Sequence, residues 1–279
     1  SRNSETLSVT VSSDDKNATF SVPSGASTGI HEAHELRDSD GKGVSLALEA
    51  VNKIIAPKLI GLDVTDQIAI DKILCDLDPD KQKGTLGANS ILGVSGAVAR
   101  LGAVVSELPL FEYLRKTFSS VTLGGYSYPH SYFNLINGGK HAHTDLAFQE
   151  YHIVPRCGSA KEDLACAIDI YNGLREKIEK EYPGTKMGDE GGYALDVESV
   201  EAPLALLKEI VEQKGYADKV SYALDVAASS FFEGNFYEYG SGAHTQEELA
   251  SLYASIAKEQ KLISIEDPFA EESFSEFAS

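Results

Sequence analysis

Tryptophan is absent from the 279-residue chain, methionine occurs once, and basic side chains are scarce. Lysine and arginine total 24 against 43 aspartates and glutamates, which gives a formal net charge of −19 at pH 7. A surface of this sign repels the phosphate backbone of nucleic acids and the headgroups of anionic membranes. We therefore expect neither as a partner. A small anionic substrate stays compatible with this charge if metal ions screen it locally.

Cysteine is also rare, and long apolar runs are missing. The three cysteines, Cys75, Cys157 and Cys166, are odd in number and form no Cys-x-x-Cys pair. This pattern indicates reduced thiols in a cytoplasmic protein. No uninterrupted apolar run approaches the roughly 18 residues of a membrane span. The polar first residues do not resemble a signal peptide, so we expect no membrane association.

The first 120 residues predict a hairpin followed by helices. Residues 5–22 read as two alternating strands joined by a polar turn. Apolar residues then recur at three- and four-residue spacing. The helices that this spacing predicts cover residues 44–59, 66–77, 88–106 and 109–117. Pro57 lies inside the first of them, so we expect that helix to kink or end near Ala56. We interpret residues 1–120 as an α+β domain.

A different rhythm follows the glycine-containing linker at 124–129, because short apolar runs now alternate with helical segments. The predicted strands are 132–136, 150–154, 221–226 and 262–265, and the predicted helices begin at the Ser159 and Glu162 capping box, near residue 197, and at the Thr245 and Glu248 capping box. Strands alternating with helices indicate a parallel sheet. We interpret residues 125–279 as a β/α barrel domain, in which active residues lie at the C-terminal ends of strands.

Acidic residues stand where several of these strands end. Asp225 and Glu266 each close an apolar run, and Gly188–Gly192 places Asp189 and Glu190 side by side between glycines. Glycine lets the backbone approach a ligand closely. By itself the glycine-flanked stretch is also typical of a plain acidic turn. The convergence of acids at strand ends favours an active site.

The same side chains favour one class of cation. Carboxylate oxygens are hard ligands that suit Mg²⁺. Zinc fits less well, because His141 and His143 lack a third histidine or cysteine at a spacing that would complete a site.

Seven segments, in order along almost the whole chain, resemble the enolase (phosphopyruvate hydratase) family. They are VPSGASTG at 22–29, LGANSILGVS at 86–95, NLINGGKHA at 134–142, FQE at 148–150, GDEGG at 188–192, LDVAAS at 224–229 and SIEDPF at 264–269. The resemblance implies an α+β N-terminal domain followed by an α/β enolase-type TIM barrel. Residues 125–279 would supply the first half of that barrel.

The resemblance also implies a reaction and its cofactors. Enolases interconvert 2-phosphoglycerate and phosphoenolpyruvate in glycolysis and gluconeogenesis, with two Mg²⁺ ions in each site. A base removes the proton next to the carboxylate, and a carboxylic acid assists loss of hydroxide. A proton beside a carboxylate is very weakly acidic, so dense positive charge must meet the developing enolate.

Motif matches assign residues to these roles. Glu190 would be the acid acting on the leaving hydroxyl, with Glu150 beside it. Asp225 and Glu266 would bind the tightly held Mg²⁺. The other implied assignments are Ser27 on the second Mg²⁺, His141, Glu150 and Glu266 in contact with the phosphorylated substrate, and Gln149 in support of the site.

The chain departs from the family pattern at Lys140, His143 and Ser230, where a small residue, a glycine and a glutamate are usual. These changes leave open an alternative, an enolase-like protein kept for a non-catalytic binding or structural role. A third interpretation is another acid-sugar or lyase member of the superfamily, but SGASTG together with GDEGG resembles the phosphopyruvate branch. A homodimer is implied by the resemblance alone.

The sequence stops at Ser279, shortly after the strand that carries Glu266. By resemblance, the rest of the barrel would bring a third metal carboxylate, a lysine base, an arginine-containing phosphate loop and a second lysine. We therefore expect a fragment of an enolase homologue with exposed sheet edges and an unfilled barrel interior. We expect this chain alone not to be a competent catalyst.

Overall fold

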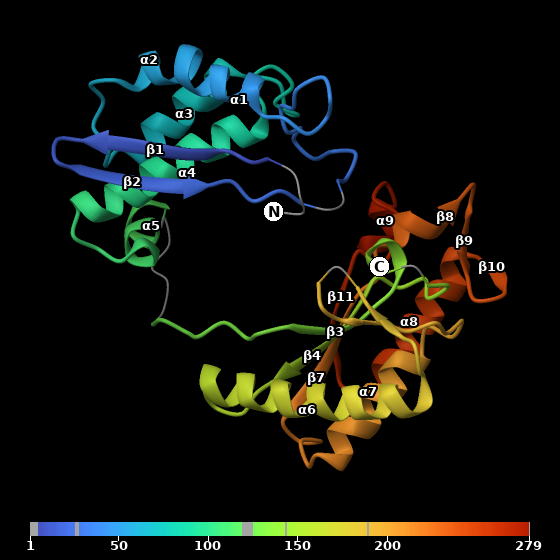
Figure 1. The fold of residues 1–279 in the computed structure, drawn as a ribbon. Helices are drawn as coiled ribbons and strands as arrows, with labels where there is room; N and C mark the ends of the chain where they lie inside the picture. Colours follow the sequence, from blue (N-terminus) through green and yellow to red (C-terminus); the bar gives the residue numbers. More distant parts are fainter. Residues whose placement is uncertain (1–4, 26–27, 119–124, 143, 189, 279) are drawn as a thin grey trace. The chain divides into compact units, whose positions relative to one another are not determined.

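The computed structural model describes residues 5–25, 28–118, 125–142, 144–188 and 190–278, and of His141 it describes the backbone only. Residues Ser1–Gly125 and Tyr126–Ser279 form two compact units (Figure 1). Each unit has its own cluster of buried apolar side chains.

The first unit opens with a β-hairpin, as the sequence predicts. Strands β1 (Ser8–Ser13) and β2 (Lys16–Ser21) pair antiparallel along their whole length. The turn between them includes Asp14, whose φ of 51° lies in the left-handed region. Aspartate tolerates this conformation better than most residues, so a polar turn residue closes the hairpin at this point.

Helix α4 (Ala88–Val105) packs across both strands of the hairpin (Figure 1). Two glycines allow the close approach: a Cβ on Gly93 would overlap Val9, and a Cβ on Gly96 would overlap the ring of Phe20. The small residues of this helix therefore face the sheet.

Helix α4 has an apolar character that no uninterrupted run in the sequence indicates. By length and composition alone, Ala88–Val105 is long and apolar enough to cross a membrane. Polar residues such as Asn89 and Arg100 interrupt its apolar run. More than half of the helix is buried against the rest of its unit, which is typical of a core helix.

Helical structure runs on through Pro57 instead of ending near Ala56. Helix α1 (Ser45–Glu49) passes into the π-helical segment η1 (Ala50–Ile55) and then into α2 (Ala56–Leu59). Proline has no N–H, and its ring clashes with the carbonyl four residues earlier in an α-helix. The N–H that follows η1 bonds a carbonyl five residues back, and this wider winding is the local distortion that accommodates the proline.

Two more helices complete the first unit, and both lie within one residue of their predicted bounds. They are α3 (Gln67–Leu77) and α5 (Leu110–Phe118). Asp66 caps the start of α3, since its carboxylate accepts the N–H of Ala69 at 3.1 Å.

Six strands form the main sheet of the second unit, in the spatial order β11-β7-β4-β3-β6-β5. Their bounds are β3 (Phe133–Asn137), β4 (Glu150–Pro155), β5 (Lys186–Met187), β6 (Tyr193–Ala194), β7 (Val220–Asp225) and β11 (Leu262–Glu266). Among the described residues the sheet is open, with β11 and β5 at its edges.

The expectation of a parallel sheet is only partly right. β7 and β11 pair in parallel, as do β3 and β6, but β4 runs antiparallel to both of its neighbours, β3 and β7. A parallel neighbour needs a crossover connection, usually a helix. In the connection from β3 to β4, the described residues contain only the short 3₁₀ turn η2 (Gly139–His141), so β4 returns in the opposite direction.

Three long helices accompany this sheet. Helices α6 (Ala160–Glu181) and α7 (Ala202–Gln213) lie along one face of it and contact β4 (Figure 1). Helix α8 (Gln246–Glu259) contacts β11. The apolar sides of these helices bury Leu174 and Leu207 completely, which places the core of the unit between helices and sheet.

The two predicted capping boxes stand at helix starts. At α8 the box is complete, because Thr245 and Glu248 each bond the backbone N–H of the other. At α6 the Ser159 hydroxyl accepts the N–H of Glu162, while the Glu162 carboxylate accepts from that hydroxyl. Side-chain oxygens satisfy the first N–H groups of both helices.

Several short elements were not predicted from the sequence. They are η3 (Ala228–Phe231), β8 (Phe232–Glu233), β9 (Phe236–Tyr239), β10 (Gly242–His244) and α9 (Phe274–Phe277). The three strands form a separate small sheet in the order β10-β9-β8. Stacking of Phe148 on Phe231, with ring centroids 6.0 Å apart, joins this part of the chain to the main core.

The first prediction concerns Gly138, which follows β3. A Cβ there would overlap the carbonyl oxygens of Leu146 and Phe148, and backbone atoms cannot move aside cheaply. We expect Gly138→Ala to lower the free energy of unfolding by about 2–3 kcal/mol, measured by chemical denaturation. Gly125→Ala is the control, since a Cβ at Gly125 meets nothing within 4 Å. Equal stability of the two variants would contradict this packing.

Candidate active site

Three carboxylates stand in a row at one end of the main sheet. Glu150 is the first residue of β4, whereas Asp225 and Glu266 are the last residues of β7 and β11. Asp225 lies opposite Glu150 in one strand pair and opposite Glu266 in the other. Residues directly opposite each other project to the same face of a sheet. The antiparallel direction of β4 therefore brings the start of that strand to the end where its neighbours finish.

Asp225, the central carboxylate, is partly buried. Its Oδ2 accepts from Nε2 of Gln149 at 3.0 Å, and its Oδ1 accepts from the N–H of Ala227 at 3.2 Å. Burial above all, followed by repulsion from Glu266 and Glu150, raises the pKa of Asp225 from 3.8 to about 6. Burial and repulsion both disfavour the ionised form of Asp225 in the folded chain.

The turns after β7 and β11 hold this geometry in a strained backbone. Ala227 has a φ of 47° and Asp267 a φ of 45°, in the left-handed region that costs a non-glycine residue about 1–2 kcal/mol. Two hydrogen bonds tie the turns together: Val226 N–H to the Glu266 carbonyl at 3.0 Å, and Ala228 N–H to the Asp267 carbonyl at 3.1 Å. Such strain persists only where the surrounding structure imposes it.

Glu190 does not belong to this row. It is exposed in the turn between β5 and β6, and its neighbour Asp189 lies outside the described residues. Nδ2 of Asn134, on β3, donates to Oε2 of Glu190 at 3.4 Å, which is a long hydrogen bond. Of the four predicted acids, Glu150, Asp225 and Glu266 therefore lie on neighbouring strands. Glu190 is linked to β3 through Asn134.

The glycines around Glu190 serve a packing purpose that the sequence did not reveal. We expected them to let the backbone approach a ligand, but Cβ atoms on Gly188 and Gly192 would both overlap the side chain of Asn137. Asn137 is fully buried, and its amide atoms have no partner among the described residues. The room that the two glycines provide is occupied by this asparagine.

Other predicted positions are only partly visible. Ser27 and His143 lie outside the described residues, and nothing is described of the His141 side chain beyond its place in η2. Lys140 and Ser230, two of the departures from the family pattern, are exposed. The roles implied for Ser27 and His141 stay predictions.

His152 is a site residue that the sequence analysis missed. Its Nε2 lies 2.7 Å from Oε2 of Glu150, and both side chains are nearly buried. The signal was present in the alternation of β4, because residues two apart in a strand point to the same face.

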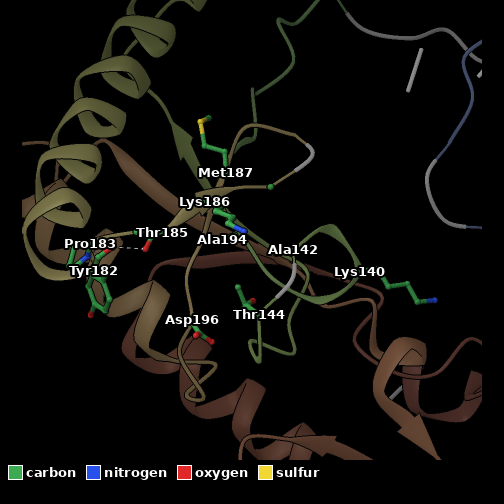
Figure 2. Close-up of a pocket in the computed structure, with 12 residues that line it drawn as sticks. Lys140, Ala142, Thr144, Tyr182, Pro183, Thr185, Lys186, Met187, Ala194 and Asp196 are labelled. Atoms are coloured by element: carbon green, nitrogen blue, oxygen red, sulfur yellow. Dashed lines mark hydrogen bonds between the residues drawn. The ribbon is translucent and has the colours of Figure 1, made fainter. Parts of the chain in front are cut away.

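A cavity of about 390 Å³ opens between η2 and the start of β5. Its polar lining includes Lys186, Thr144, Thr185 and Asp196. In Figure 2 the Lys186 side chain lies among the other lining residues, whereas Lys140 extends away from them. None of the four predicted acids lines this cavity, so it does not coincide with the carboxylate row.

The carboxylate row suits a divalent cation in chemistry but does not enclose one. Asp225 and Glu266 offer hard oxygen ligands, and repulsion from Glu266 and Glu150 adds to burial in raising the pKa of Asp225, an effect that a bound cation would oppose. Within the described ranges, no three His, Cys, Asp or Glu side chains gather closely enough to hold a metal ion. The described part of the row therefore offers ligands suited to Mg²⁺ without completing a site.

The second prediction follows from the pKa of Asp225. A carboxyl whose pKa is higher in the folded chain contributes stability below its unfolded pKa of 3.8, and this contribution is lost as pH rises through about 6. At pH 7 without metal, we expect Asp225→Asn to raise the free energy of unfolding by about 1 kcal/mol, a value reduced for solvent screening. At pH 4 the variant should match the wild type.

Magnesium should reverse the order of stability of the wild type and Asp225→Asn at pH 7. A cation that binds only the folded chain stabilises it, so Mg²⁺ should raise the melting temperature of the wild type at pH 7 and leave Asp225→Asn unchanged. Asp218→Asn is the control, because Asp218 is exposed and outside the row. The same response from both variants would contradict the role of Asp225.

Comparisons with known proteins place these features in one family. The family model for "Enolase, N-terminal domain" matches residues 1–114, and that for "Enolase, C-terminal TIM barrel domain" matches residues 125–279. These matches confirm the α+β domain and the barrel domain that the sequence predicts.

Full-length relatives agree. Proteins named enolase share 44% identity with this chain in Methanocaldococcus jannaschii, 41% in Thermococcus gammatolerans and 43% in Methanococcus aeolicus. The alignments cover 92%, 99% and 92% of this chain, but the chain spans only 61–66% of the length of these curated relatives. On the matches to both domains, the chain belongs to the enolase family.

Proposed function

We propose that these 279 residues belong to a phosphopyruvate hydratase, a hydro-lyase that converts 2-phosphoglycerate to phosphoenolpyruvate with Mg²⁺ in the glycolysis of the cytoplasm. The observation that carries the proposal is the register that aligns Glu150, Asp225 and Glu266 at one end of three adjacent strands. Membership of the family supplies the reaction class. Because the chain spans less than two thirds of its relatives, the activity is proposed for the whole protein.

The main chemical difficulty of this reaction is the negative charge that develops when the proton is removed, and cations held by the row would stabilise it. Removing a proton beside a carboxylate creates further negative charge, which must meet fixed positive charge at once. Asp225 and Glu266 would hold one Mg²⁺ and Ser27 would reach a second. When bound, these ions would supply that charge. The carbonyl of Glu266 accepts a hydrogen bond from the Val226 N–H, which holds the backbone of one proposed ligand beside that of the other.

The remaining acids would handle protons and substrate. Glu190 would protonate the departing hydroxyl oxygen, with Glu150 beside it, and His141 would contact the substrate. Glu190 is exposed and connected to β3 through Asn134, so it is accessible from solvent before substrate binds. A general acid has to lie within hydrogen-bond reach of the group it protonates, which the exposed position of Glu190 permits.

The proton-abstracting base is the part of the mechanism that these residues do not supply. The family resemblance implies a lysine base and a third metal carboxylate beyond the segments matched here. We therefore propose that catalysis belongs to a chain of the relatives' length, and that such a chain forms a homodimer.

The third prediction tests this division directly. The 279-residue chain, mixed with 2-phosphoglycerate and Mg²⁺, should form phosphoenolpyruvate at least about a thousandfold more slowly than an enolase of full family length, as expected when a general base is lost along with a metal ligand. The ultraviolet absorbance of the product measures the rate. Turnover within tenfold of the full-length enzyme would refute the proposal.

Binding separates the enzyme from an enolase-like protein kept for another purpose. Calorimetric titration of 2-phosphoglycerate should detect binding that requires Mg²⁺ and is lost in Glu266→Gln, because the amide is a poorer cation ligand. Glu272→Gln, an exposed acid outside the row, is the control. Metal-independent binding would favour the non-catalytic alternative.

A further inference from the structure

Glu150 and His152 form a buried pair on β4. The two side chains lie on the same face of the strand, and the His152 Nε2 is 2.7 Å from the Glu150 Oε2. Only 11% of the His152 side chain and 12% of the Glu150 side chain are exposed. A contact this short between nitrogen and carboxylate oxygen is typical of a charge-assisted hydrogen bond.

The chemistry of the pair fixes its direction. With Glu150 ionised, its carboxylate can only accept hydrogen bonds, and the imidazole donates from Nε2. The Tyr132 ring meets the imidazole edge to face, with centroids 6.1 Å apart and planes at 81°. His152 therefore contacts both an aromatic ring and the carboxylate.

The position of His152 in the sheet links it to both Glu150 and Glu190. Its cross-strand partner on β3 is Asn134, whose Nδ2 donates to Glu190. Its side chain reaches Glu150, which stands beside Asp225 at the end of the sheet. His152 thus lies between the two carboxylates to which proton handling is assigned in the proposed function.

Glu150 needs a donor of this kind. It is buried and stands opposite Asp225 in the β4–β7 pair, and repulsion between like charges directly opposite each other favours rotation of one side chain away. A strong donor on one carboxylate oxygen limits rotation of the side chain and so orients the carboxylate.

We propose that His152 is a positioning residue for the active site: by donating its Nε2–H, it holds the Glu150 carboxylate in the orientation that meets the substrate. This inference rests on the proposed function for the identity of the substrate only. The alternative is a purely structural role, in which buried His152 stabilises the sheet without orienting Glu150 for the substrate.

Two substitutions separate these roles. His152→Gln keeps an N–H donor at a similar distance from the backbone, whereas His152→Leu fills similar space without a donor. His130→Leu removes an exposed histidine elsewhere in the unit and serves as the control. Thermal unfolding of each variant records the stability effect separately.

The fourth prediction is spectroscopic and needs no substrate. In ¹⁵N-resolved spectra of the full chain, the His152 ring should show a proton on Nε2 that is protected from water. Its exchange should become at least about tenfold faster in Glu150→Gln, where the acceptor is neutral and weaker. The side-chain carboxyl carbon of Glu150 should keep its sharp resonance in His152→Gln and shift or broaden in His152→Leu. Identical Glu150 signals in all variants would overturn the proposal.

Binding then tests the functional consequence. With Mg²⁺ present, the affinity for 2-phosphoglycerate should fall at least about tenfold in His152→Leu and stay within about threefold of the wild type in His152→Gln and His130→Leu. Equal losses in the Gln and Leu variants would show a structural role and overturn the proposal. Should the wild-type chain bind no 2-phosphoglycerate, the spectroscopic result alone decides whether His152 positions Glu150, and the proposed function is then tested on a chain of the relatives' length.

Discussion

The antiparallel strand β4 is the constraint on which the site depends. Because it runs opposite to β7, its first residue, Glu150, meets the last residue of β7, Asp225, and through that strand the last residue of β11, Glu266. A shift of one residue in this register would turn every side chain of β4 to the other face. Helices α6 and α7 contact the strand, and its residues are buried along their whole length, so the core that stabilises the unit also fixes the spacing of the carboxylates.

The clustering of acids at the end of the sheet lowers the stability of the fold while it provides ligands for a cation. The row places acids together, and burial with repulsion between these acids raises the pKa of Asp225. Left-handed Ala227 and Asp267 add backbone strain at the same place. Proteins concentrate such features where a function uses them, and here they surround the residues that a divalent cation would stabilise. The segment with the strained backbone and the raised carboxyl pKa is therefore also the segment whose side chains could bind a cation.

The sequence predicted the order of elements far better than their directions. Apolar spacing located the hairpin, α3, α4 and α5 to within a few residues, because each of these patterns is local. The direction of β4 was missed, since it depends on what connects two strands and not on the strands themselves. Pro57 was recognised as a disturbance, but π-helical winding was not predictable from one residue. In the site, Asp225 and Glu266 could be found from their place at strand ends, whereas the partnership of Glu150 with His152 required looking along the face of one strand.

The burial of Asn137 between Gly188 and Gly192 has a consequence for how this chain can vary. A larger residue at either glycine position has nowhere to go unless the asparagine shrinks in the same step. Positions 137, 188 and 192 are therefore linked as a compensatory set: single changes should be rejected, and tolerated combinations should trade volume between β3 and the acidic turn. Few combinations of substitutions at these three positions should therefore be tolerated, although none of the three residues carries a charge.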